Sequence, residues 1–155
     1  MNRSDIEQKL AEIGLKLPAV AAPVASYVPA RRTGTLVHTS GQLPIRDGSL
    51  MAKGVIPGDV TEADGQACAA QASLNAVAAC LSVVGEHEGI LGVVRVGVWV
   101  ASAPGFAGQP GVANGASELL VSIFGEAGKH ARAAVGSVAL PLKTPVEVEV
   151  LFEVG

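Results

Sequence analysis

A length of 155 residues predicts a single domain with room for a sizeable core. The formal net charge is −3, only 16% of the residues are charged, and the basic residues form no stripe, which argues against nucleic-acid binding by charge. Because so little charge covers a chain that is 49% hydrophobic, the composition favours an oligomer over a monomer.

The cysteines and the first residues of the chain indicate the cellular compartment in which the protein is expected. Cys68 and Cys80 lie on one expected helix, too far apart along it to pair, so we expect two free thiols in the core and a reducing environment. The charged first residues lack the apolar region of a signal peptide. No stretch reaches the roughly 18 unbroken apolar residues of a membrane span. We therefore expect a cytoplasmic protein that does not enter a membrane.

The N-terminal residues predict a short helix. Residues 4–7, Ser-Asp-Ile-Glu, have the spacing of a capping box. Apolar residues then recur at helical intervals up to Gly14, namely Ile6, Leu10 and Ile13. The stretch of 16–34 contains three prolines and should run extended toward the first strands.

The middle of the chain predicts a strand, a surface connection and a long helix. Residues 35–45 are typical of a strand that ends at Ser40-Gly41, and residues 46–60 form a glycine-containing connection. Thr61 has the spacing of a helix cap, and the helix should end at Gly85. Its apolar stripe consists of Ala67, Ala70, Leu74, Val77 and Leu81.

The second half of the chain predicts three strands and one more helix. Residues 90–101 are apolar on both faces, as in a central buried strand. Pro110 suits the first turn of a helix whose core positions are Ala116, Leu119, Leu120 and Ile123. Two strands follow, around 131–139 and 146–154.

The last strand alternates strictly between two kinds of side chain. Val146, Val148, Val150, Phe152 and Val154 share one face, and Glu147, Glu149 and Glu153 share the other. The element order predicts an α+β fold: a mixed sheet in a single domain, with two helices on one face and an added N-terminal helix. The valine face should meet the helices. The glutamate face should meet water, another subunit or a functional site.

Several common site patterns are absent from the sequence. The glycine-rich residues 105–115 lack the lysine-hydroxyl ending of a phosphate loop. His38, His87 and His130 have no metal-like spacing, and no serine-hydrolase elbow is present. We expect no metal and no cofactor.

Arg132 is a charged residue in an otherwise small and apolar strand. A buried guanidinium needs an anionic partner, because an unpaired buried charge costs several kcal/mol. One interpretation is a structural ion pair with Glu147 or Glu149 on a neighbouring strand. The other is a planar fork that binds a substrate carboxylate, with Glu147 nearby to orient water or transfer protons. Both interpretations remain open on these residues alone.

Four ordered pieces of the sequence resemble signatures of the RidA/YjgF family, the reactive intermediate deaminases. They are Ser26-Tyr27-Val28, Thr39 to Pro44, Asn114 to Glu118, and a C-terminal block formed by 131–135, 140–141 and 146–149. The resemblance covers roughly residues 25–155 and leaves 1–24 as an N-terminal helix and extended arm. The chain has Ala25-Ser26-Tyr27 where the family usually has Gly-Pro-Tyr, a longer loop at 45–60, one extra residue between Asn114 and Arg132, and the additional helix. These departures suggest a divergent subgroup.

The resemblance implies a chorismate-mutase-like fold that assembles as a homotrimer with clefts between subunits. It also implies hydrolysis of enamine or imine intermediates, made by pyridoxal-phosphate enzymes, to 2-keto acids and ammonia without metal or cofactor. In that comparison Arg132 holds the substrate carboxylate and Glu147 positions the attacking water. The residues implied to line the cleft are Tyr27, Ser40, Gly41 and Asn114.

Two other functions remain as alternatives. A protein of the same fold could bind a small carboxylate without turnover, as a sensor or regulatory module. An endoribonuclease is the weaker alternative, because the chain is acidic and offers no aromatic platform for stacking bases.

Overall fold

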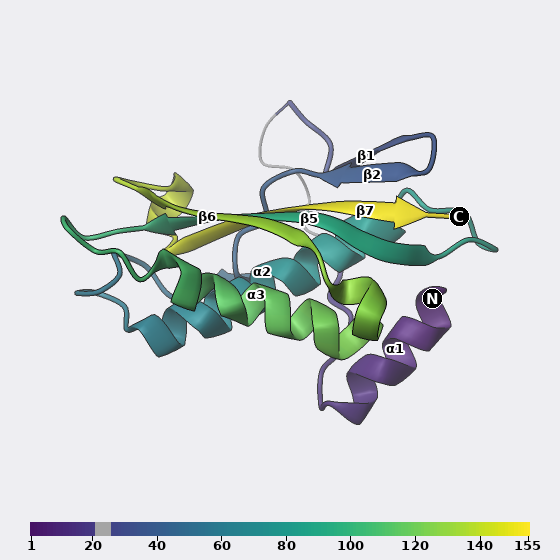
Figure 1. The fold of residues 1–155 in the computed structure, drawn as a ribbon, viewed down its shortest axis with the longest axis horizontal. Coiled ribbons are helices and arrows are strands. Elements are labelled where there is room, and N and C mark those ends of the chain that lie inside the picture. The colour runs from purple at the N-terminus through teal and green to yellow at the C-terminus, as the bar shows by residue number, and fades with distance from the viewer. Residues whose placement is uncertain (21–25) are drawn as a thin grey trace.

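The structure is a computed structural model that describes residues 1–20 and 26–155. A sheet lies over two long helices, which cover the same face of it, and a short helix packs at one end (Figure 1). The helices are α1 (Arg3–Glu12), α2 (Glu62–Leu81) and α3 (Gln109–Phe124), with short 3-10 turns η1 (Gly125–Gly128) and η2 (Pro141–Lys143). The strands are β1 (Ala30–Thr33), β2 (Leu36–Thr39), β3 (Ile45–Arg46), β4 (Ser49–Leu50), β5 (Ile90–Ala101), β6 (Ala131–Ser137) and β7 (Val146–Val154).

The main sheet has five strands in the order β1-β2-β7-β5-β6. Strand β5 pairs antiparallel with β7 and parallel with β6, so the sheet is mixed and β6 is an edge strand. The α+β fold with two helices on one face and an additional N-terminal helix is confirmed. Among the described residues no helix has the length and apolar character needed to cross a bilayer.

The core lies between this sheet and the two long helices. The predicted alternation of β7 is confirmed, since Val148 and Phe152 are fully buried on the helix side while Glu147 and Glu149 lie on the open side. Phe152 packs edge-on against Phe124 of α3, with ring centroids 6.4 Å apart. The predicted core positions of α3 are all buried. Small side chains let α2 be buried almost all round from residue 71 to 81.

The ends of α1 differ from the prediction. The capping box is formed by Asn2 and Asp5, each side chain accepting the other's backbone N–H at 3.0 Å, so the helix begins at Arg3 and Ser4 lies inside it. The helix ends at Glu12. Ile13 is its C-terminal cap and is 42% exposed, so it is not a core residue.

Two further boundaries also differ. The connection at 46–60 contains a hairpin of β3 and β4, whose turn residues Asp47 and Gly48 have φ values of 51° and 80°. Asp-Gly is the sequence signal of this turn, and the predicted connection does not include the hairpin. Helix α2 starts after the Thr61 cap as predicted but ends at Leu81 rather than Gly85, and Ala67 is exposed.

The cysteines lie where the sequence predicted. Cys68 and Cys80 are both buried and free. Burial raises the pKa of the Cys68 thiol to about 11 and that of Cys80 to about 12. Part of the predicted extended run, and the predicted domain boundary between residues 24 and 25, lie outside the described residues, so that division stays a prediction.

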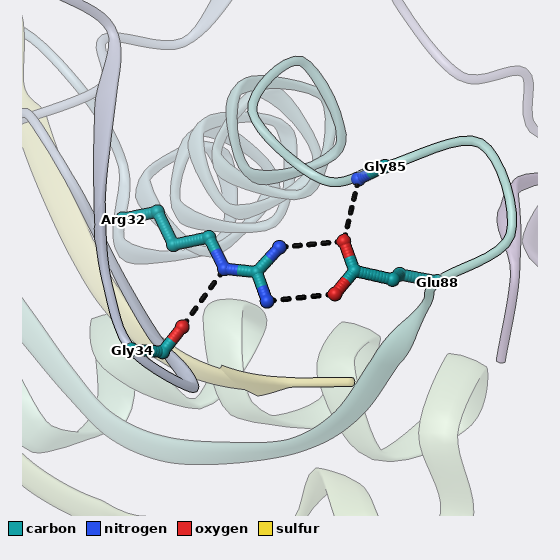
Figure 2. A network of polar contacts seen from close by, with 4 residues as sticks. All are labelled: Arg32, Gly34, Gly85 and Glu88. Carbon is teal, nitrogen blue, oxygen red and sulfur yellow. Dashed lines mark hydrogen bonds and ion pairs between the residues drawn. The ribbon is translucent and has the colours of Figure 1, made fainter.

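The Arg32 side chain joins strand β1 to the loop between α2 and β5 (Figure 2). The two Nη atoms of Arg32 donate to the Glu88 carboxylate at 2.5 and 2.7 Å, and its Nε donates to the Gly34 carbonyl at 2.8 Å. The Gly85 backbone N–H donates to the same carboxylate at 2.9 Å. The Arg32 contact above all, and then the Gly85 N–H, lower the pKa of Glu88 to about 2.

This lowered pKa predicts a pH-dependent loss of stability in the Glu88→Gln variant. Because the carboxylate has a lower pKa in the fold than in the unfolded chain, its stabilisation is present above its ordinary pKa of 4.5 and is lost as the pH falls through about 2. The unfolding free energy of the variant should therefore be lower than that of the wild type at pH 7, and the gap should close between pH 4.5 and 2. Urea unfolding across this range measures it, with the exposed Glu86→Gln as control. A gap that does not change with pH would contradict the prediction.

Candidate functional site

Arg132 lies on β6 and faces helix α3. In the sheet it is opposite Val96, which is buried beneath the helices, so the arginine side chain leaves the sheet on the helix side. Its Nη1 donates to Asn114 Oδ1 at 2.9 Å and to Ser117 Oγ at 3.1 Å. Its Nη2 donates to the Pro110 carbonyl at 3.4 Å. The structure thus brings Arg132 and Asn114 together, as the sequence analysis expected of one site.

The structural ion pair proposed for Arg132 is wrong within the chain. Arg132 is exposed, and its partners among the described residues are neutral oxygens. Glu149 pairs instead with Arg95, at 3.1 Å. The exposure explains why no buried counter-charge is needed. The guanidinium charge is therefore oriented without being neutralised by a carboxylate of the described chain.

A second group of predicted site residues surrounds Glu147. A Cβ atom on Gly41 would lie 1.9 Å from Glu147 Oε1 and 2.8 Å from its Cδ, so the carboxylate rests directly against the glycine backbone. Gln42 and Val148 exchange backbone hydrogen bonds of 2.7 and 3.0 Å, which hold this segment against β7. Only glycine at position 41 leaves room for this placement of the Glu147 carboxylate.

Ser40 connects this group to the segment that carries Tyr27. The Ser40 hydroxyl donates to the Val28 carbonyl at 2.6 Å, and the Ser40 backbone N–H donates to the Pro29 carbonyl at 2.9 Å. The Tyr27 side chain is 46% exposed. Ser40 therefore has a structural contact that positions the segment next to Tyr27, whose phenol remains accessible.

The environment of Glu147 favours its protonated form. Burial first, and the negative charge of Glu149 second, raise the pKa of the Glu147 carboxyl above its ordinary value. A raised pKa in a partly buried position is a feature of carboxyls that take part in proton exchange. Within residues 1–20 and 26–155, no three His, Cys, Asp or Glu side chains gather in a way that could hold a metal ion.

Arg132 and Glu147 do not face each other within one chain. The expectation that they lie on neighbouring strands is wrong, because β5 lies between β6 and β7. Arg132 is in register with Val96, whereas Glu147 is in register with Trp99, so the two side chains also leave opposite faces of the sheet. Strand geometry puts their Cα atoms roughly 14 Å apart. One small molecule cannot contact both side chains of a single chain.

Two site residues were missed by the sequence analysis. The Ser117 hydroxyl lies 2.9 Å from His130 Nε2, and His130 Nδ1 lies 2.6 Å from the Gly128 carbonyl. A signal was available: His130 precedes Arg132 by two residues, and so shares its side of an extended strand. Ser117 follows Asn114 by three residues and so shares its face of the helix.

The comparisons with known proteins cover nearly the whole chain. A family model described as "YjgF/chorismate_mutase-like, putative endoribonuclease" matches residues 7–154. Protein TCP17 of Trypanosoma cruzi is 41% identical over 151 residues, which are 97% of this chain and 94% of that protein.

Solved structures are also similar. The protein Atu1372 from Agrobacterium tumefaciens superposes with a TM-score of 0.87 at 37% identity, covering 98% of this chain and 94% of that one. RidA from the Antarctic bacterium Psychrobacter sp. PAMC 21119 gives a TM-score of 0.57 at 28% identity, covering 87% of this chain and 93% of that one.

Proposed function

The chain belongs to the YjgF/chorismate-mutase-like family, and on that premise we propose that it hydrolyses reactive enamine or imine intermediates to 2-keto acids and ammonia. The observation that carries the proposal is the Arg132 guanidinium, which neutral oxygens hold in place without neutralising its charge. A substrate with a carboxylate next to its reactive carbon would supply the missing anion.

The hydrogen bonds of Arg132 leave two donors for that carboxylate. A guanidinium has five N–H groups. Two of them, on Nη1, are directed at Asn114 and Ser117, and one, on Nη2, is directed at Pro110. One N–H on Nη2 and the N–H on Nε remain, and these form the side of the fork that binds both oxygens of a carboxylate. Asn114 acts in this proposal by fixing the fork.

The rest of the site comes, in this proposal, from a second copy of the chain. Glu147 and Gly41 lie on the open face of the sheet, which also carries the partly exposed Trp99 and Leu151. An uncovered sheet face with apolar side chains favours a homo-oligomer, and we propose a trimer with its clefts between subunits. The Glu147 carboxyl of the neighbouring copy would then position the water that attacks the imine carbon. Ser40 and Tyr27 would line the same side of the cleft.

The reaction requires little from the protein beyond the positioning of the substrate and of the reacting groups. A protonated imine is already electrophilic, so orientation of water and transfer of protons are sufficient for hydrolysis. No metal or cofactor is part of the proposal. The proposed setting is the cytoplasm, with a small imino acid as substrate and no nucleic acid or membrane as partner.

The Arg132→Ala variant tests the proposal directly. An amino-acid oxidase supplies an unstable 2-imino acid in place, and release of the 2-keto acid is followed against buffer. Because the variant lacks the only proposed carboxylate clamp, its kcat/KM should fall by about 100-fold, the value of losing a charge-assisted bidentate contact. Arg3→Ala removes an exposed arginine on α1 and should behave like wild type. If the wild-type protein releases the 2-keto acid no faster than buffer does, the proposed activity is wrong.

Carboxylate binding without turnover is the second candidate function. It is favoured by one observation, that the Arg132 cluster is complete within a single chain and does not need Glu147. Stabilisation of the protein by 2-keto acids that disappears in Arg132→Ala, together with no turnover, would establish it. The endoribonuclease activity named in the family description is a weaker candidate, because the net charge is −3.

A further inference from the structure

Trp99 is the direct neighbour of Glu147 on the open face of the sheet, the face that the helices leave uncovered. The two residues are Cα partners in the antiparallel pair of β5 and β7. Side chains of directly opposed residues leave the same face, with their Cβ atoms about 5 Å apart. Trp99 is half-buried and is the only tryptophan of the chain. An indole with an accessible part thus lies beside the carboxyl proposed to position water.

The backbone of β5 makes room for this indole. Gly97 lies two residues earlier on the same face, and a Cβ atom there would lie 3.0 Å from Cη2 of Trp99. That separation is tighter than ordinary van der Waals contact, so a side chain at residue 97 would push the ring away. Gly97 is buried although it has no side chain of its own. The benzene edge of the indole therefore rests on the sheet and covers this glycine.

The other neighbours of Glu147 on this face offer no apolar surface. On one side the backbone of Gly41 lies directly against the carboxylate. Two residues further along β7, Glu149 is charged and paired with Arg95 at 3.1 Å. Among these described neighbours, the accessible apolar group next to the Glu147 carboxyl is the indole of Trp99.

The apolar surface continues across the sheet to its edge. Val135 is the Cα partner of Trp99 in the parallel pair of β5 and β6, and it is 47% exposed. Trp99 and Val135 therefore form a strip that starts beside Glu147 and ends at the edge strand. A strip of this kind stabilises an apolar side chain by removing its surface from water, and the indole adds the stacking of an aromatic ring.

We propose that Trp99 is a specificity-determining residue, and that the preferred substrates are imino acids with a bulky apolar or aromatic side chain. The inference rests on the proposed function. In that scheme Arg132 of one copy holds the carboxylate, and Glu147 of the neighbouring copy holds the attacking water. Such a water lies about 3 Å from the imine carbon, so the substrate side chain on that carbon begins within reach of the indole. A charged side chain would lose its hydration there without gaining a partner.

A contact between subunits is the competing explanation, because Trp99 lies on the face proposed to meet other copies. Leu151 provides the matched control. It lies on the same face of β7, opposite Arg95 and four residues from Glu147, roughly 13 Å away by strand geometry. Trp99→Ala and Leu151→Ala both remove apolar area from the open face. Trp99→Ala alone removes the surface next to Glu147.

The test compares kcat/KM for imino acids that an amino-acid oxidase makes from leucine, phenylalanine and alanine. The wild type should prefer the two larger substrates over the alanine-derived one by about 10-fold or more, as one or two methylene groups in an apolar pocket do. In Trp99→Ala this preference should fall by about 10-fold, while kcat/KM for the alanine-derived imine stays within about threefold of wild type. Trp99→Phe and Leu151→Ala should keep most of the preference. Size-exclusion chromatography measures the assembly of each variant.

The fluorescence of the only tryptophan gives a second measurement that needs no turnover. The keto acid of leucine should change the emission of the wild type, and pyruvate should need about 10-fold higher concentration for the same change. Arg132→Ala should lose the response to both keto acids, because the carboxylate is no longer held.

The outcomes separate this inference from the function on which it rests. An unchanged preference in a Trp99→Ala protein that hydrolyses the imines would overturn the inference and leave the proposed function intact. Weaker assembly of both alanine variants, with the preference unchanged, would establish the subunit contact instead. If the wild type hydrolyses none of the imines, the proposed function is wrong and the fluorescence titration decides alone. A tighter response to the keto acid of leucine would then support the role of Trp99 in carboxylate binding, and an equal response or none would overturn it.

Discussion

Arg132→Ala and Glu147→Gln chains, each nearly inactive alone, should regain activity when they are unfolded together and refolded as a mixture. The structure puts the two side chains on opposite faces of one chain's sheet, so a shared site needs Arg132 from one copy and Glu147 from another. In a random mixture an interface is intact when Arg132 comes from a Glu147→Gln chain and Glu147 from an Arg132→Ala chain. That is one pairing in four, so about a quarter of wild-type activity should return.

A second mixture provides the control. Arg132 and Asn114 contact each other within one chain, at 2.9 Å. Chains with Arg132→Ala and chains with Asn114→Ala therefore each lack part of the same half of the site, and mixing them should restore nothing. Recovery in the first mixture and not in the second would support a site between subunits. No recovery in either, from chains that refold and assemble, would contradict it.

Gly115→Ala should be the most destabilising of these substitutions. A Cβ atom at residue 115 of α3 would lie 2.0 Å from the Gln66 carbonyl oxygen and 2.9 Å from its Cα. These are backbone atoms of α2, so no side chain can rotate away and the two helices must move apart. Alanine favours a helix over glycine by about 1 kcal/mol, but overpacking of this kind costs more than that gain. We expect a net loss of about 3 kcal/mol in the free energy of unfolding, measured by urea denaturation.

Gly111→Ala is the matched control for this prediction. It lies one turn earlier on the same helix, and a Cβ atom there would meet nothing closer than Glu62 Oε2 at 4.0 Å. Helix propensity alone then acts, so this variant should be slightly more stable than wild type, by at most about 1 kcal/mol. Equal stability of Gly115→Ala and wild type would mean that the helices can separate at little cost.

The sequence predicts the layers of this fold well because periodic patterns record burial directly. The alternation of β7 identified its two faces, and the unbroken apolar run of β5 identified the central strand. Helix ends were predicted less well, because Asn2 and Ser4 are both good capping residues and only the backbone decides between them. The Asp47-Gly48 hairpin was missed although its turn signal is present.

The site could be predicted as a set of residues but not as an arrangement. Alternation shows which side of its own strand a residue occupies, and says nothing about which strands are neighbours. The position of β5 between β6 and β7 therefore could not be inferred from Arg132 and Glu147, nor could their opposite directions. Ser117 contacts Arg132, and His130 contacts Ser117, through the packing of α3 against an edge strand. The spacing of these residues shows which ones share a face of their own element, and not that the two elements meet.

The buried cysteines make the chain convenient for spectroscopy. At pH 8 a thiol with a pKa of about 11 or 12 is almost entirely protonated, and both thiols are also shielded from reagents. The thiols of the natural chain should therefore not react with maleimide dyes while the protein is folded. A single cysteine introduced at Val138, which is 95% exposed just beyond β6, would then be the only thiol to carry a dye. Energy transfer between dyes on separate copies would then follow subunit exchange in real time, without any background substitution.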